Sequence, residues 1–490
     1  MSASDFHVCQ PGTVIDRRDI APVVFDVFAE TITSGVRDGD RLLALVAQPS
    51  GTGHRLYGVL TLRDQGALGV IATDVADSFP SLTRQCASAH LFEREIAETS
   101  GLRPDGHPWL KPVRFLRSPV GVTEFFAMSG ADVHEVAVGP VHAGVIEPGH
   151  FRFACVGETV LHLEIALGYQ HRGIEPALVG GPGLRTIHYM ETLAGDTSVG
   201  HATAYCQNLE TLAHRPAPPR GMMLRSVALE LERLANHVGD LGALAGDVGF
   251  LPVASHCGRI RGEFLNLTSL ICGNRLGRGI ARPGGVGFDL DDGQIETLLR
   301  NLKRASEEAR DALQLLWDSP SAMDRFETTG SLTAPLCREL GIVGPPARAA
   351  GLERDARLEF PSDLFRFAQI PVSLWQSGDV FARAYVRWLE IIRSSEFIAA
   401  QLAAAPPGPC RAPVGQLAPN ALTVSLVEGW RGEICHVACT DDDGRFAWYK
   451  VVDPSFHNWQ GLAMAMRNQP ISDFPLCNKS FNLSYCGHDL

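Results

Sequence analysis

The sequence predicts an α+β fold: a small α/β N-terminal domain over residues 1–120, followed over residues 121–490 by a large, mainly helical domain with marginal β-strands. Three observations predict it. Two strand-like runs lie close together before residue 65, three long stretches with helical periodicity follow residue 218, and short apolar runs flank those stretches. With 490 residues, 45% of them hydrophobic and 20% charged, the chain is long enough for two or three domains with a substantial core.

The N-terminal domain is predicted to contain a β-hairpin. RLLALVAQ from Arg41 and RLYGVLTL from Arg55 are strand-like, and the turn-rich sequence PSGTGH separates them. A helix is expected near the end of this domain, in the stretch that begins at Ser88. Between Phe115 and Gly130 the sequence has few helix signals, so we place a linker and the domain boundary there.

The second domain is predicted to hold three long helices. From Pro219, apolar residues recur at spacings of three and four and form one stripe. A second helix starts with the acidic residues at Asp291, and a third starts near Asp379 and ends before two prolines at residues 406–407. Three long helices predict a helical bundle with strands at its margins.

Charge and hydropathy exclude several classes of partner. A net charge of −12 argues against nucleic acid, because binding phosphate needs clustered Lys and Arg. No apolar run approaches the ~20 residues that span a bilayer, and the N-terminal sequence MSASDFHVCQPG has neither a basic start nor an apolar signal core. We therefore expect a cytoplasmic protein that reaches a membrane only through partner subunits.

Two motifs carry a family resemblance: METLAGDTSVGHATAYC from Met190 and SDFPLCNKSFNLSYCGHDL from Ser472. Around them, in order, lie GPVHAGVIEPGHFRF, YQHRGIE, LELERLANH, RPGGV, RAAGLERDAR, LVEGWRGEICH and SFHNWQG. In this order the segments resemble the large subunits of membrane-bound nickel–iron hydrogenases of the formate hydrogenlyase and hydrogenase-4 type. They resemble more loosely the quinone-site subunit of respiratory complex I.

The N-terminal domain carries a second resemblance. The triplet Glu-Arg-Glu at residues 93–95 is followed by Gly-Leu at 101–102 and Pro-Asp-Gly at 104–106. This spacing is similar to that of the small peripheral-arm subunit of complex I. The resemblance implies that this small subunit is fused ahead of the large one. For the triplet alone, the alternative is a solvated helix face.

The hydrogenase resemblance implies where four cysteine ligands of a nickel–iron centre would lie. Aligned on the family motifs, these positions are Ala194, Thr197, Ser484 and Gly487. Thiolates hold such centres, so the resemblance implies a variant of the energy-converting hydrogenase-related type, with the nickel–iron centre absent. The twelve cysteines include no C-x-x-C pair, and we expect them to be reduced.

The complex I resemblance implies a quinone-binding histidine in the loop that holds His142 and His150. Imidazole can donate a hydrogen bond to a quinone carbonyl, and its protonation changes near neutral pH. His150 is the closest match, and for either residue alone the alternative is a histidine hydrogen-bonded to the backbone. The second quinone contact of that relative, a tyrosine, falls on Gly195, which cannot donate the bond.

Polar residues next to the missing ligands are candidates for a different site. Asp196 and His201 could supply new polar contacts, the first as a cofactor-binding residue and the second as a catalytic one. The equal alternative is that side chains fill this cavity and it binds no ligand. Arg431, in EGWRGE, matches a family turn that lines the metal cavity, and the alternative is turn chemistry at Gly429 and Gly432.

Glu175, in HRGIE, is the second candidate catalytic residue. It matches a glutamate that the hydrogenase relatives place near the metal cavity as a proton-path member. A carboxylate desolvated there has a raised pKa and can pass protons, whereas the alternative is a surface ion pair with Arg172. Glu230 and Arg233 lie three apart in LELERLANH, which predicts a structural ion pair on one helix face, with a role in coupling as the alternative.

These expectations combine into a subunit of a membrane-associated respiratory oxidoreductase complex, peripheral on the cytoplasmic side. The resemblance implies an iron-sulfur small subunit, whose cluster would be the electron carrier, and antiporter-like membrane subunits as partners. The chain would then transfer electrons to quinone or couple to ion translocation without nickel–iron chemistry. The alternatives are a redox-inactive structural coupling module and an active hydrogenase. Glycine turns at residues 180–186 and 282–287 lack a Rossmann fingerprint, so NADH would bind another subunit.

Overall fold

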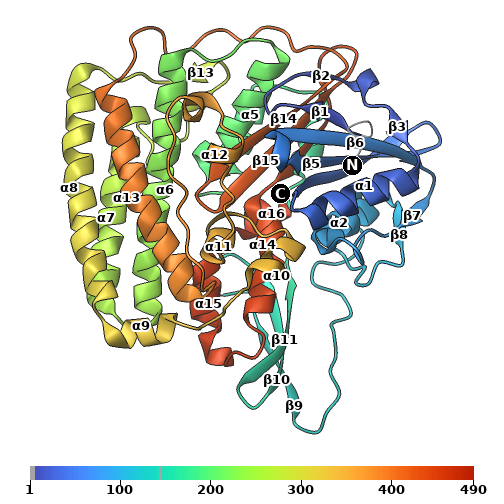
Figure 1. Cartoon of the computed structure of the whole chain (residues 1–490), viewed down its shortest axis with the longest axis horizontal. Helices are drawn as coiled ribbons and strands as arrows, with labels where there is room; N and C mark the ends of the chain where they lie inside the picture. Colours follow the sequence, from blue (N-terminus) through green and yellow to red (C-terminus); the bar gives the residue numbers. More distant parts are fainter. Residues whose placement is uncertain (1–5, 143–145) are drawn as a thin grey trace.

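The computed structural model describes residues 6–142 and 146–490. A bundle of long helices forms one side of the molecule and the N-terminal sheet forms the other, with a second sheet between them (Figure 1). The α+β fold class predicted from the sequence is confirmed. No described helix is long and apolar enough to cross a membrane.

The N-terminal part forms a five-stranded sheet. The predicted hairpin is confirmed: β4 (Leu42–Ser50) pairs antiparallel with β5 (Gly53–Leu62). The helix expected near the end of this part is α2 (His90–Ser100), which ends at Gly101 in the left-handed conformation. The other elements are β1 (His7–Cys9), β3 (Pro22–Val23), α1 (Phe25–Asp38), β6 (Ala67–Val75), β7 (Ser78–Pro80) and β8 (Arg103–Asp105). The strands lie in the order β1-β6-β5-β4, with β3 parallel to β6.

The Glu-Arg-Glu triplet on α2 is not a solvated face, so that interpretation is wrong. Glu93 is fully buried and accepts hydrogen bonds from the Leu82 amide at 2.6 Å and from two hydroxyls of the preceding turn. Glu95 is also buried and pairs with Arg114 and Lys450. The pair with Lys450 ties the N-terminal part to the C-terminal sheet, 355 residues further along the chain.

Four long helices form the bundle (Figure 1). They are α6 (Pro219–Asp247), α7 (Leu251–Cys272), α8 (Asp292–Trp317) and α13 (Val380–Ala403). The three predicted helices are confirmed as α6, α8 and α13. Asp291 and Gln294 form a capping box at the start of α8, and Asp379 caps α13 by accepting from a backbone amide.

The central sheet has the order β16-β15-β14-β2. Its strands are β2 (Ile15–Asp16), β14 (Ala421–Gly429), β15 (Gly432–Thr440) and β16 (Phe446–Val452). Every residue of β14 and β15 is buried. One core contains side chains of this sheet together with those of the N-terminal sheet, so the two parts share buried surface. The domain boundary near residue 120 stays a prediction.

A third sheet with the order β11-β10-β9 extends from the body at the bottom of Figure 1. An irregular segment leads into it from β8. Its strands are β9 (Val133–Val138), β10 (His150–Val156) and β11 (Thr159–Ala166). The shorter helices are α3 (Ile174–Leu178), α4 (Thr186–Thr192), α5 (Ser198–Leu212), α9 (Pro320–Phe326), α10 (Ala334–Leu340), α11 (Gly344–Ala349), α12 (Ala356–Glu359), α14 (Pro454–Ala465), α15 (Phe474–Phe481) and α16 (Tyr485–Asp489). A small ribbon pairs β12 (Ala281–Arg282) with β13 (Gly285–Val286).

Candidate functional site

The candidate site lies where the turn between β14 and β15 meets the start of α5 and the last helix, α16. The turn is tight because Gly432 has φ 139° and a Cβ there would lie 2.9 Å from the Gly344 backbone. A side chain at Gly432 would therefore push α11 away from the turn. This close approach fixes the backbone that carries Trp430 and Arg431.

Arg431 and Asp196 form a bidentate ion pair at the centre of the site. The two Nη atoms of Arg431 lie 2.5 and 2.8 Å from the Asp196 carboxylate oxygens. Arg431 also donates to the Thr197 hydroxyl at 3.1 Å and to the carbonyl of Asn482 at 2.5 Å, and its guanidinium lies 3.9 Å from the Trp430 ring centroid. Burial acts to raise the pKa of Asp196, but Arg431 outweighs it and holds that pKa below its usual value.

His201 is the first ring of a buried hydrogen-bonded chain. Its Nε2 lies 2.9 Å from Asp453, and its Nδ1 lies 3.0 Å from Nε2 of His436. The other ring nitrogen of His436 lies 2.9 Å from the Tyr449 hydroxyl. Burial and the neighbouring His201 lower the pKa of His436 well below its usual value, so this ring is neutral at physiological pH. A chain of this kind can hold a proton at alternative atoms without exposing a charge to solvent.

The four positions where the resemblance places cysteine ligands are all buried around these groups. Ala194 has no ligating atom. Thr197 accepts from Trp430 and Arg431, and the Ser484 hydroxyl caps α16 by accepting from the Gly487 amide at 2.9 Å. A Cβ on Gly487 would lie 2.7 Å from Cγ of Asp453, so a carboxylate occupies the space that a fourth ligand would need. These residues do not fit a nickel–iron centre.

No group of three or more His, Cys, Asp or Glu within residues 6–142 and 146–490 is arranged to hold a metal ion. Cys486 is the thiol beside the site, one residue before Gly487. Burial and the nearby Glu147 raise the pKa of Cys486 to about 11. A buried thiol with a raised pKa is a weak nucleophile at neutral pH.

The two loop histidines lie outside the site. His142 Nε2 lies 2.9 Å from the carbonyl of Gly149, and the ring of His150 packs 5.1 Å from that of Phe125. Neither histidine contacts Asp196 or Arg431 in the part of the loop that the structure describes. Residues 143–145 of the same loop lie outside the described residues. Both histidines remain predictions as quinone contacts.

Glu175 is also apart from the Asp196–Arg431 pair. Its carboxylate accepts from the Val451 amide at 2.9 Å and pairs with Lys450 at 3.0 Å. The proposed ion pair with Arg172 is therefore wrong, because Arg172 donates to the backbone carbonyls of residues 192 and 193. Glu175 lines a separate cavity of about 450 Å³, next to the strand that carries Tyr449.

Sequence reasoning did not identify Asp453, His436 or Tyr449 as site residues. Asp453 is the N-cap of α14 and begins a clear cap sequence, Asp-Pro-Ser. His436 lies in the middle of the largely apolar strand β15, and a polar ring inside a buried strand needs a hydrogen-bond partner. Both signals were available in the sequence.

A buried glutamate contacts the first turn of α5. Glu232 accepts from the amides of Val199 and Gly200, at 2.7 and 3.2 Å, at the first turn of that helix. Burial raises the pKa of Glu232 to about 8 in spite of these hydrogen bonds. The first turn of α5, the helix that carries His201, is therefore hydrogen-bonded to a carboxyl group that titrates near physiological pH.

We expect this group to make stability pH-dependent. Its folded pKa of about 8 exceeds the unfolded value of 4.5, so its contribution is complete below pH 4.5 and is lost as pH rises through 8. Glu232→Gln removes the titration but keeps only one of the two accepting oxygens. Urea unfolding should show the parent chain losing stability relative to the variant between pH 5 and pH 9, whatever the difference between the two proteins at pH 5. The exposed Glu296→Gln is the control, and the same relative change between pH 5 and pH 9 in that variant would contradict the assignment.

Buried ion pairs continue from the site into the bundle. The predicted pair of Glu230 and Arg233 is confirmed at 3.0 Å, and Arg233 also reaches Glu390 on α13 at 3.3 Å. Arg348 lies between Glu390 and Glu428, 2.7 Å from each. All five side chains are at most 2% exposed, so each charge depends on the others for compensation.

Family models match two parts of the chain. Residues 38–120 match the respiratory-chain NADH dehydrogenase 30 kDa subunit, and residues 247–420 match the 49 kDa subunit of the same enzyme. The chain thus combines, in one polypeptide, segments of two subunit types of a respiratory oxidoreductase.

Curated relatives extend the match over most of the chain. The carbon monoxide-induced hydrogenase of Rhodospirillum rubrum is 31% identical over 350 residues, which cover 71% of this chain and 97% of the relative. Formate hydrogenlyase subunit 5 of Escherichia coli is 28% identical over 83% of this chain and 76% of its own length. NADH-quinone oxidoreductase subunit 4 of Thermus thermophilus is 28% identical over 70% of this chain and 90% of its own length.

The fold and the matches define the chain as a subunit of an oxidoreductase complex. More closely, it belongs to the family of large subunits that includes these hydrogenases and the 49 kDa-type subunits of respiratory NADH dehydrogenase, with a 30 kDa-type segment fused ahead.

Proposed function

We propose that this chain is the large peripheral subunit of a membrane-associated respiratory complex and that it works without nickel–iron chemistry. One observation carries the proposal: Arg431, paired with Asp196, and the Asp453 carboxylate occupy the space around the four former ligand positions. A guanidinium has no lone pair to offer a metal, and its pair with Asp196 engages the nearest carboxylate. The carboxylate beside Gly487 leaves no room for a fourth ligand.

We infer that the site acts in coupling. The Arg431 guanidinium donates a hydrogen bond to the backbone carbonyl of Asn482. The side-chain amide of Asn482 donates to Asp240 at 2.6 Å, and Asp240 pairs with Arg387 of α13 at 3.0 Å. A path of direct contacts therefore runs from Asp196 into the bundle. Such a contact chain supports coupling to ion translocation, which mutational coupling energies can measure.

Electron transfer to a quinone bound at this site is the second candidate function, because one relative is an NADH-quinone oxidoreductase subunit. The free donors near the site are few. Trp430 Nε1 already donates to Thr197 and to the carbonyl of Asp196, and His142 is bonded to Gly149. A quinone would have to displace one of these bonds. Protection of the chain from photolabelling by a quinone analogue would support this candidate, and equal labelling with excess quinone would contradict it.

The proposed partners are an iron-sulfur small subunit and antiporter-like membrane subunits, which would hold the chain on the cytoplasmic side of the membrane. The test is mass spectrometry of proteins that co-purify with the tagged chain after extraction of membranes with mild detergent. The proposal predicts an iron-sulfur subunit and polytopic membrane subunits in defined ratios. Recovery of the chain alone from the soluble fraction, with none in the membranes, would contradict it.

The ion pair at the site should have a measurable coupling energy. In a double-mutant cycle with Asp196→Ala and Arg431→Ala, we expect an interaction of about 1 to 2 kcal/mol in urea unfolding. This range is discounted because the Asp196 side chain is 36% exposed and solvent screens the pair. Cycle energies near zero, with both single variants folded, would show that the pair does not hold the site together.

A further inference from the structure

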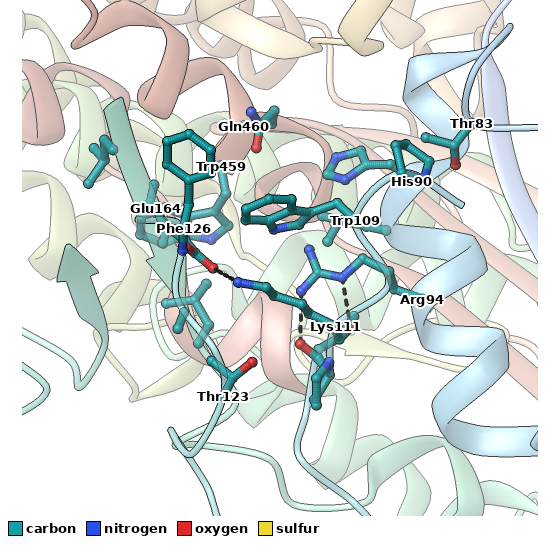
Figure 2. A pocket seen from close by; sticks show the side chains of 18 of the residues that line it. Thr83, His90, Arg94, Trp109, Lys111, Thr123, Phe126, Glu164, Trp459 and Gln460 are labelled. Atoms are coloured by element: carbon teal, nitrogen blue, oxygen red, sulfur yellow. Dashed lines mark hydrogen bonds and ion pairs between the residues drawn. The ribbon is translucent and has the colours of Figure 1, made fainter. Parts of the chain in front are cut away.

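A separate cavity of about 380 Å³ lies between the N-terminal part, β11 and α14 (Figure 2). Its lining includes Arg94, Trp109, Lys111, Phe126 and Glu164, and none of its lining residues belongs to the Asp196–Arg431 pair or to the His201 chain. Its volume is in the range of small-molecule sites, about 300 to 1,000 Å³. Nothing in the proposed function uses this cavity.

Arg94, on α2, presents an unpaired positive charge to the cavity. Its Nε and one Nη each donate at 2.8 Å, to the carbonyls of Lys111 and Pro112, which fixes the plane of the guanidinium (Figure 2). The second Nη has no hydrogen-bond partner among the described residues, and no carboxylate of residues 6–142 or 146–490 lies within 4.0 Å of Arg94. A guanidinium at a cavity wall without a carboxylate is an anion-binding group.

The remaining charges of the cavity form no ion pair with Arg94 within 4.0 Å among the described residues. Glu164 and Glu98 attract it at longer range and raise its pKa, whereas burial has the larger effect and lowers that pKa to about 10. Arg467 is a further cation of the lining. Glu164, the one carboxylate among the lining residues, is bound by Lys111 at 2.7 Å and by the Phe126 amide at 2.7 Å. Burial and the charge of Arg94 lower the pKa of His90 to about 3, and burial lowers the pKa of His107 to about 4. Both rings are therefore neutral at physiological pH, and the cavity disfavours a further cation.

The walls are aromatic and carry two unsatisfied ring nitrogens. The rings of Trp109 and Phe126 lie 5.8 Å apart, and Phe126 lies 4.5 Å from the ring of His162. Trp459 is 3% exposed, and its Nε1 is buried without a hydrogen-bond partner among the described residues, as is Nε2 of His162. A buried polar group of this kind normally has a partner, so a ligand or ordered water belongs beside it. Flat aromatic walls favour a planar ring.

We propose that this cavity binds a planar aromatic carboxylate, with the carboxylate on the Arg94 guanidinium and the ring against the wall that Trp109 and Phe126 form together. The indole N–H of Trp459 is available to a second polar atom on the ring. The site lies where the 30 kDa-type segment meets the large-subunit fold, so a bound ligand would contact both. Occupancy would therefore stabilise their association.

The test is titration of the full chain with 2-naphthoate, followed by calorimetry and by tryptophan fluorescence, with uncharged 2-naphthamide as the matched probe. We expect saturable 1:1 binding of naphthoate and at least ten-fold weaker binding of the amide. Arg94→Gln should weaken naphthoate binding by about ten- to hundred-fold, because it removes a hydrogen bond between two charged groups. Glu164→Gln should strengthen it several-fold, because it removes the one lining carboxylate.

Circular dichroism establishes that each variant is folded, and Arg259→Gln, on the outer surface of α7, is the control that should bind like the parent chain. The opposite signs expected for Arg94→Gln and Glu164→Gln keep the test decisive even if one variant fails to fold. The proposal is overturned if naphthoate shows no saturable binding, if the amide binds equally well, or if the folded charge variants leave the affinity unchanged.

Discussion

Arg348→Met should destabilise the protein by about 3 to 5 kcal/mol, because it leaves two buried carboxylates without their shared cation. Arg348 is fully buried and lies 2.7 Å from both Glu390 and Glu428. Methionine keeps the apolar stem but not the guanidinium, so the hydrogen bond to the carbonyl of Arg354 and some buried volume are lost together with the charge. Urea unfolding of the purified chain at pH 8, followed by circular dichroism, measures the change.

The pH dependence of the stability loss in Arg348→Met distinguishes the effect of the lost charge from the effect of altered packing. Burial raises the pKa of Glu428 to about 7 even with Arg348 in place, so without the arginine this carboxyl takes up a proton still more readily. The destabilisation should therefore be smaller at pH 5.5 than at pH 8. The control is Arg300→Met on α8, whose pair with Glu296 is exposed on both sides and should contribute about 0.5 kcal/mol or less. A pH-independent loss in Arg348→Met would point to packing instead.

Gly487→Ala should destabilise the protein by about 2 to 4 kcal/mol, through overpacking and the loss of buried hydrogen bonds. The added Cβ would lie 2.7 Å from the Asp453 carboxylate, which is held by the Ser455 amide at 2.7 Å and by His201 at 2.9 Å. Moving Asp453 breaks both bonds. Thermal and urea unfolding measure the loss.

Gly195→Ala is the matched control at the same site. A Cβ there meets no atom within 4 Å, and Gly195 does not have a positive φ, so we expect a change within about 0.5 kcal/mol. If Gly487→Ala is as mild as Gly195→Ala, then Asp453 does not fill the former ligand position. In that case the site retains room for a ligand, and the proposed function loses its main support.

The regular elements were predictable where one local signal dominated. The hairpin and three of the four long helices carry strong period-two or period-3.6 patterns and clear caps. The helix α7 was missed although Val253, Cys257, Ile260 and Phe264 form an apolar stripe. Its interior glycines, at positions 258 and 262, lower helix propensity, and packing against α6 compensates for this only in the folded chain.

The site was predictable only in part, because its contacts join distant segments. Asp196 and Arg431 were both identified, but their pairing across 235 residues is a property of the fold. For Glu175, a candidate proton-path residue, the alternative was an ion pair with the nearby Arg172, whereas the fold brings Lys450 to it from the central sheet. His201 was expected to line a cavity and instead forms a buried chain with Asp453 and His436.

Metal analysis of the intact complex tests the central claim most directly. The complex would be isolated through a tag on this chain, and nickel would be measured by inductively coupled plasma mass spectrometry relative to the chain, with a nickel–iron hydrogenase purified in parallel. Nickel is the informative metal because an iron-sulfur partner contributes iron. With Arg431 and Asp453 in the former ligand space, we predict nickel at the level of a mock purification. Nickel in equimolar amount with the chain would contradict this account.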